Sequence, residues 1–142
     1  MKAKILLRTA SIMVMLHTLG HTLGALSWKN APNAAIKVVI DGMLGNRFDF
    51  GGKSVSIGDF YAGYGYSMIG VLLMITVLLW LLSNETISTL SRQIRWITSI
   101  LLLFLGVVEL TCFFPLPAVL SLLAAIATLV SLFAKQGNKA SS

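Results

Sequence analysis

Charged residues are scarce in this sequence of 142 residues. Asp, Glu, Lys and Arg together make up 11% of it, whereas soluble domains carry about 25%. Hydrophobic residues make up 56%, and the mean hydropathy is +0.85. A soluble globule this short needs a far more polar surface. The composition argues against a soluble enzyme, a disordered chain and a nucleic-acid-binding domain, and it predicts one integral membrane domain.

Cysteine and acidic residues are also few. Cys112 is the single cysteine, so an internal disulfide is excluded. Five acidic residues stand against 11 basic ones, which gives a net charge of +6. The basic residues gather at the ends of apolar stretches, where such residues fix membrane topology. We therefore expect the lipid bilayer, and not nucleic acid, as the partner.

The apolar residues predict four membrane-spanning helices. A helix of roughly 20 residues crosses the hydrocarbon core. Proline is rare in the chain, and Pro115 and Pro117 divide a last apolar stretch that is too long for one helix. The expected fold is an all-α, four-helix transmembrane bundle in a single domain, 1–142. Its predicted helices cover about 7–28, 58–83, 93–114 and 117–134, and a flexible polar tail covers 135–142.

The first apolar stretch has an alternative interpretation as a signal peptide. Lys2, Lys4 and Arg8 would form its basic region, and Ala25-Leu26-Ser27 is a passable cleavage site. The stretch is long, however, and two histidines interrupt it. We therefore expect it to be retained as the first helix of the bundle.

The distribution of basic residues predicts cytoplasmic N- and C-termini. The positive-inside rule places the larger number of Lys and Arg in cytoplasmic segments. With both termini inside, seven basic residues lie in the cytoplasm: Lys2, Lys4, Arg8, Arg92, Arg95, Lys135 and Lys139. Four lie in the single long outer loop: Lys29, Lys37, Arg47 and Lys53.

The outer loop has structure of its own. Residues 33–43 carry apolar side chains at helical spacing, which predicts a short interfacial helix. Two short runs around Gly51-Gly52 predict a hairpin. Ser56 and Asp59 then resemble a capping box at the start of the second spanning helix, with Asp in place of Glu. Capping gives Asp59 a purely structural alternative to any functional role.

Each predicted spanning helix has one face of small or polar residues, and we expect these faces to meet. Gly20 and Gly24 form a GxxxG pattern, which allows close approach of helices in lipid. Gly63 and Gly70 repeat the small-residue spacing in the second helix. In the third helix the face includes Glu109 and Cys112, and in the fourth it consists of Ser121, Ala124, Ala125 and Thr128.

Ionisable residues and tyrosines converge in the outer half of this bundle. Helical phase and depth at 1.5 Å per residue predict that His21 and Glu109 lie within reach of each other. His17 is then deeper, and Asp59 lies at the mouth with Tyr61, Tyr64 and Tyr66. Ionisable groups inside a membrane are costly and face the bundle interior, so they are functional candidates by default.

Three interpretations of this cluster remain open. In the first, His17, His21, Glu109, Asp59 and Tyr61 are catalytic candidates that act on a small lipophilic molecule by acid/base chemistry. In the second, His17, His21 and Glu109 bind iron or zinc, because His-x3-His places both imidazoles on one helix face. In the third, the protein is a non-enzymatic interaction or assembly subunit, and the cluster holds its helices together. The sequence identifies no cofactor and no substrate.

The layout resembles small bacterial four-span membrane proteins that are broadly DoxX-like. The resemblance is carried by His17-Thr-Leu-Gly-His21 in the first helix and by Ser56-Ile-Gly-Asp59-Phe60-Tyr61-Ala-Gly63 at the start of the second. It implies a multi-pass inner-membrane protein of unassigned activity. A looser likeness to sterol-isomerase-type four-helix domains carries no residue roles over. Four short helices in one chain leave little room for a transport pathway. A transport role would therefore require a homo-oligomer.

Overall fold

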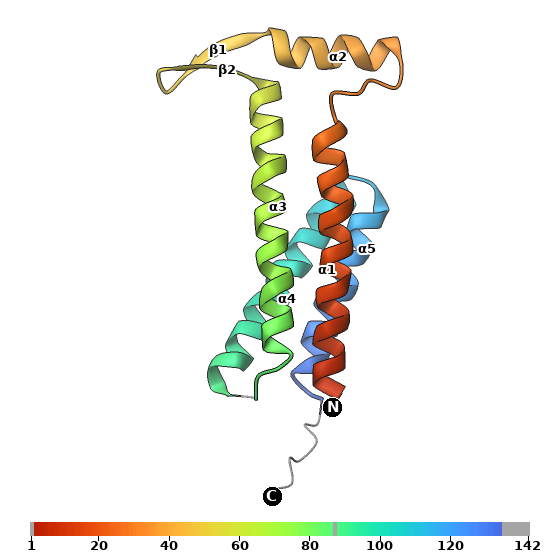
Figure 1. The fold of residues 1–142 in the computed structure, drawn as a ribbon, viewed down its shortest axis with the longest axis vertical. Coiled ribbons are helices and arrows are strands. Elements are labelled where there is room, and N and C mark those ends of the chain that lie inside the picture. Colours follow the sequence, from red (N-terminus) through yellow and green to blue (C-terminus); the bar gives the residue numbers. More distant parts are fainter. Residues whose placement is uncertain (1, 87, 135–142) are drawn as a thin grey trace, which may run out of the picture. The chain divides into compact units, whose positions relative to one another are not determined.

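A computed structural model describes residues 2–86 and 88–134, and the expected tail at 135–142 lies outside this range. The elements in chain order are α1 (Lys2–Ser27), α2 (Ala34–Gly45), β1 (Arg47–Phe50), β2 (Lys53–Ser56), α3 (Ile57–Leu82), α4 (Thr89–Cys112) and α5 (Pro115–Ser131) (Figure 1).

Three helices, α1, α3 and α4, are long and apolar enough to cross a membrane. The expectation of a helical membrane protein is therefore confirmed. The fourth apolar helix, α5, has 17 residues and is shorter than the other three. A bundle of four spans stays a prediction.

The chain divides into two compact units. One contains residues 1–18 and 72–142, and we call it the α4–α5 unit. The other contains residues 19–71, and we call it the hairpin unit. Both α1 and α3 run from one unit into the other.

In the α4–α5 unit, α4 and α5 pack through small residues. The expected face of α5 is buried, and it consists of Ser121, Ala124, Ala125 and Thr128. Opposite it, Gly106 of α4 permits close approach, because a Cβ at this position would lie 2.7 Å from the side chain of Leu122. Cys112, which we expected on the same face of α4, is exposed.

Polar contacts join α1, α3 and α4 within the same unit. The Ser11 hydroxyl donates to the Thr76 carbonyl at 2.8 Å. The Arg8 guanidinium lies over the Trp80 ring, 4.7 Å from its centroid, and donates to Asn84 Oδ1 at 3.4 Å. Arg95 donates to the Leu82 carbonyl at 3.4 Å. Both arginines thus lie beside the C-terminal end of α3, where a helix dipole favours cations.

The proline-rich break between α4 and α5 lies where the sequence predicts it. The helix α4 ends at Cys112, and α5 begins at Pro115, which needs no amide partner at the first helical position.

The start of α4, at Thr89, is earlier than the expected residue 93. Ser88 and Ser91 cap it reciprocally at 3.1 and 3.0 Å, so the helix extends beyond the apolar run.

The hairpin unit contains α2 and an antiparallel pair of strands. Asn33 caps α2 by accepting from the Ile36 amide at 2.9 Å. The strands pair from Arg47 with Ser56 to Phe50 with Lys53. Between them, Gly51 and Gly52 have φ of 58° and 80°. Positive φ at both central positions is the requirement of a type I′ hairpin turn, and glycine meets it without strain.

The glycine contacts differ from those predicted. A Cβ at Gly20, Gly24 or Gly63 would meet no atom of the hairpin unit within 4 Å, so these glycines do not make the expected close approach between α1 and α3. In the hairpin unit the close approaches occur at Gly58 and Gly65 instead. A Cβ at Gly58 would lie 2.8 Å from the Leu44 side chain, and one at Gly65 would lie 3.3 Å from Ala25.

Candidate functional site

His17 forms the centre of a buried polar cluster in the α4–α5 unit. Its Nε2 lies 3.4 Å from Glu109 Oε1, and its Nδ1 lies 3.1 Å from Ser121 Oγ. The imidazole therefore joins a carboxylate from α4 and a hydroxyl from α5 to α1. The exposed fractions are 5% for His17, 8% for Glu109 and 1% for Ser121. We call these three residues the His17 cluster.

Small neighbours make room for the His17 cluster. Ser121 lies between Ala118 and Ala124 on the buried face of α5, so α5 presents its hydroxyl on a surface without bulky side chains. Glu109 follows Gly106 by three residues on the buried face of α4. Residues three and four apart share a helix face, and the same packing surface therefore carries both the close helix contact and the carboxylate.

The cluster can hold a proton in more than one arrangement. With a neutral imidazole, one ring nitrogen donates and the other accepts, while the Ser121 hydroxyl can do either. A proton can therefore lie on Glu109, on Nε2 or on Nδ1 while the neighbouring bonds are kept. Glu109 Oε2 is buried and has no hydrogen-bond partner among the described residues. A buried acceptor without a partner is costly, so this oxygen can accept a further donor.

Glu109 pairs with a different histidine from the one that we predicted. We expected His21, whereas the imidazole beside Glu109 is that of His17, one helical turn earlier. His21 Nε2 lies 3.1 Å from the Gly65 carbonyl oxygen in the hairpin unit. Positions i and i+4 point in similar directions, so helical phase alone could not separate the two histidines.

Asp59 and Tyr61 have local partners in the hairpin unit. Asp59 Oδ2 accepts from the Ser56 amide at 2.9 Å, and Ser56 Oγ accepts from the Asp59 amide at 3.1 Å. The same carboxylate lies 3.4 Å from Arg47 Nη1. The Tyr61 ring packs against Trp28 with centroids 4.9 Å apart. The structural alternative for Asp59, a helix cap, is thus present.

The metal interpretation required His17, His21 and Glu109 together. Among residues 2–86 and 88–134, no group of three or more His, Cys, Asp and Glu side chains lies in a position to hold a metal ion. Of these three residues, His17 and Glu109 are in contact. These two residues alone fall short of the three protein ligands typical of catalytic zinc sites.

The sequence did not single out two of the buried polar residues, Ser121 and Arg95. Ser121 was assigned only to a small-residue face, although a hydroxyl among alanines at helical spacing was the available signal. Arg95 was counted only as a basic residue for topology. It is 1% exposed, and its Nε and Nη1 have no hydrogen-bond partner among the described residues. Nothing in the local sequence distinguishes it from an exposed arginine.

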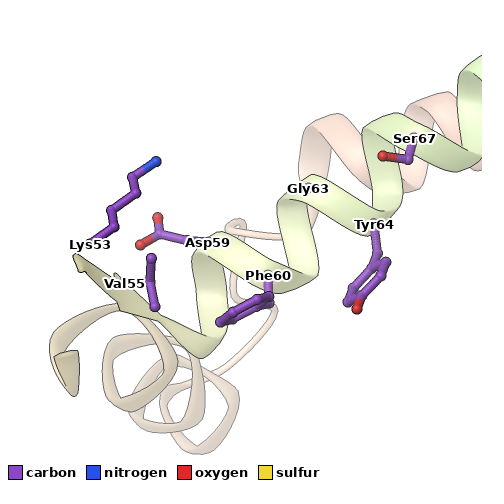
Figure 2. Close-up of a pocket in the computed structure, with 7 residues that line it drawn as sticks. All are labelled: Lys53, Val55, Asp59, Phe60, Gly63, Tyr64 and Ser67. Carbon is purple, nitrogen blue, oxygen red and sulfur yellow. The ribbon is translucent and has the colours of Figure 1, made fainter. Parts of the chain in front are cut away.

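A groove lies on the hairpin unit, and it shares no residue with the His17 cluster. Its volume is about 290 Å³, and Figure 2 shows its lining residues, which come from β2 and the first three turns of α3: Lys53, Val55, Asp59, Phe60, Gly63, Tyr64 and Ser67. The Lys53 ammonium and the Asp59 carboxylate occupy one end, and the Tyr64 and Ser67 hydroxyls lie further along α3 (Figure 2).

Comparisons with protein-family models, with curated proteins and with solved structures found no match to this chain.

Proposed function

We propose that this protein exchanges a proton with a small lipophilic molecule at the His17 cluster. One observation carries the proposal: an imidazole joins a carboxylate to a hydroxyl, at 3.4 and 3.1 Å, inside an apolar helical unit. A histidine and a carboxylate within hydrogen-bond reach are the groups that general acid/base catalysis uses. The DoxX-like resemblance names no activity that conflicts with this proposal.

The unpartnered oxygen of Glu109 supports a role for a ligand. A hydroxyl or enol proton of a lipophilic molecule can be donated to Oε2, which has no other donor among the described residues. Glu109 accepts this proton, and His17 Nε2 can take it over. The imidazolium then donates from Nδ1 to Ser121 Oγ until the proton returns to the molecule. The cluster lies partly on α1 and α4, which are long and apolar enough to cross a membrane, and this favours a substrate that reaches the site from lipid rather than from water.

The proposal includes the membrane arrangement. We propose that α1, α3, α4 and α5 cross the inner membrane, with both termini in the cytoplasm and α2 and the hairpin outside. Arg8 and Arg95 support this orientation, because both lie beside the C-terminal end of α3 in the α4–α5 unit. Trp80 contacts Arg8, and tryptophan with arginine is typical of a membrane–water interface.

Lipid analysis of cells that produce the protein tests the activity. Wild type should change the abundance of at least one lipophilic metabolite relative to cells without the protein, and Glu109→Gln and His17→Gln should abolish the change. Asp41→Asn is a matched control, because its carboxylate pairs with Lys37 on exposed α2. Equal metabolite profiles for wild type and Glu109→Gln would refute the acid/base proposal.

The second candidate is a non-enzymatic assembly protein, and the burial of the His17 cluster favours it. Three helices donate one residue each to the cluster, so the contacts stabilise the α4–α5 unit without any ligand. In that case Glu109→Gln lowers thermal stability in detergent and leaves the metabolites unchanged. Measuring stability and metabolites on the same variants therefore separates the two candidates.

A further inference from the structure

The groove on the hairpin unit combines a charged end with an open course along α3. The charged end is formed by Lys53 of β2 and Asp59 of α3, and Val55 and Phe60 follow (Figure 2). Ser67 lies ten residues after the start of α3, which corresponds to about 15 Å along the helix. Because α3 is long and apolar enough to span a membrane, the groove runs from the end of the span to roughly half its depth.

Lys53 is the groove's unpaired charge. Asp59 is already engaged by the Arg47 guanidinium at 3.4 Å and by the Ser56 amide. No ion pair among the described residues involves Lys53. Asp49, the other carboxylate of the hairpin, pairs with Ser54, next to Lys53 in the register. Since side chains alternate along a strand, Asp49 projects from the opposite face.

The course of the groove is open because of Gly63. A Cβ at this position would meet no atom of the hairpin unit within 4 Å, so the space above the backbone holds no other part of this unit. Tyr64 and Ser67 add hydroxyls along the same course. The volume of about 290 Å³ is at the lower end of small-molecule sites, which span roughly 300–1,000 Å³.

We propose that this groove binds an anionic phospholipid, with the headgroup phosphate at Lys53 and one acyl chain along Gly63. The Lys53 ammonium is complementary in charge to the headgroup phosphate, and the open surface at Gly63 leaves room for one acyl chain, with the Tyr64 and Ser67 hydroxyls further along α3 (Figure 2). The groove shares no residue with the His17 cluster, so the proposal is independent of the acid/base function.

Native mass spectrometry of the full chain in detergent tests the headgroup assignment. The probes are phosphatidylglycerol and phosphatidylcholine with identical acyl chains, added in equal amounts. Wild type should bind phosphatidylglycerol in preference. Lys53→Gln should lower the ratio of bound phosphatidylglycerol to bound phosphatidylcholine by about fivefold, the usual effect of one basic residue at an anionic surface.

Lys29→Gln is the matched charge control for this measurement. It removes the same charge from the same unit, at a residue that contacts Trp28 and does not line the groove. We expect the wild-type ratio. Equal losses in Lys29→Gln and Lys53→Gln would show a general surface potential and overturn the site.

Filling the groove tests the position of the acyl chain. Gly63→Leu should abolish binding of both lipids, whereas Gly20→Leu, at another open glycine in the hairpin unit, should retain it. Ser67→Leu fills the same groove one turn further and replaces Gly63→Leu if circular dichroism shows that the latter is unfolded. Retained binding in a folded groove variant would refute the proposal, as would displacement of the lipid by excess glycerol phosphate, which lacks a chain.

Discussion

At the residue scale, Ser121 contributes more to the fold than its size indicates. Its hydroxyl bonds to His17 Nδ1 across two helices. Ser99, by contrast, bonds within its own helix, where its hydroxyl donates to the Arg95 carbonyl. A helix carbonyl already accepts from the amide four residues on, so its additional bond to a serine is dispensable. The bond between Ser121 and His17, in contrast, joins α5 to α1.

We therefore expect Ser121→Ala to lower the free energy of unfolding by about 1 kcal/mol, the typical net value of such a bond. Ser99→Ala, at a position equally buried, should change the free energy of unfolding by roughly a few tenths of a kcal/mol at most. Thermal unfolding of both variants in the same detergent checks the difference. Equal stability of the two variants would mean that the contact of Ser121 with His17 contributes nothing.

Gly106 lies close to α5 in the α4–α5 unit. A methyl group there would lie 2.7 Å from the Leu122 side chain and 3.3 Å from the Leu122 amide nitrogen. Gly106→Ala should therefore destabilise the protein by about 1–3 kcal/mol, as overpacking does. Gly70→Ala, where nothing lies within 4 Å, should leave stability unchanged or raise it slightly, because alanine favours a helix. Chemical unfolding in mixed micelles measures the stability of both variants. If Gly106→Ala were as stable as wild type, α5 would be able to shift away from α4 without cost.

The candidate site was predictable in its residue types and not in its pairing. The scarcity of charge made His17, His21 and Glu109 conspicuous in the sequence. Which histidine meets Glu109 depends on the tilt and axial offset of α1 against α4, and apolar patterning does not encode either. The glycines show the same limit: Gly20 and Gly106 have similar surroundings in the sequence, yet only Gly106 faces a neighbouring helix closely.

At the element scale, helix ends follow caps more closely than they follow the limits of apolar runs. Prolines set the boundary between α4 and α5, and this was predictable from the sequence. The expected start of the first helix, residue 7, was late, because α1 begins at Lys2 and includes its basic flank. Lysine and arginine are good helix formers, so a loss of hydropathy does not end a helix.

The reciprocal cap at the start of α3 offers a test at this scale. Ser56→Ala should destabilise the first turn of α3 by about 1 kcal/mol, because the Asp59 amide loses its acceptor. Hydrogen exchange of the first-turn amides should accelerate accordingly. Ser27→Ala, at a hydroxyl that bonds back to Leu23 in α1, serves as the control. Unchanged exchange in Ser56→Ala would show that the hairpin, and not the cap, fixes this end.

At the scale of the whole molecule, the proposed topology predicts opposite accessibility for the two ends of α3. In a Cys112→Ser background, a cysteine at Ser54 should react with a membrane-impermeant maleimide in intact cells. A cysteine at Asn84 should react only after lysis. Labelling of both in intact cells would exclude α3 as a span, and the reverse pattern would invert the topology.

The shortness of α5 has a consequence for the surrounding lipid. Its 17 residues extend about 26 Å at 1.5 Å per residue, whereas a typical hydrocarbon core is about 30 Å thick. As a spanning helix, α5 creates a hydrophobic mismatch that the bilayer relieves by thinning beside it. The protein should therefore favour thin membranes: lipids with shorter acyl chains should raise its thermal stability in nanodiscs, and in a membrane of mixed thickness it should partition towards the thinner regions.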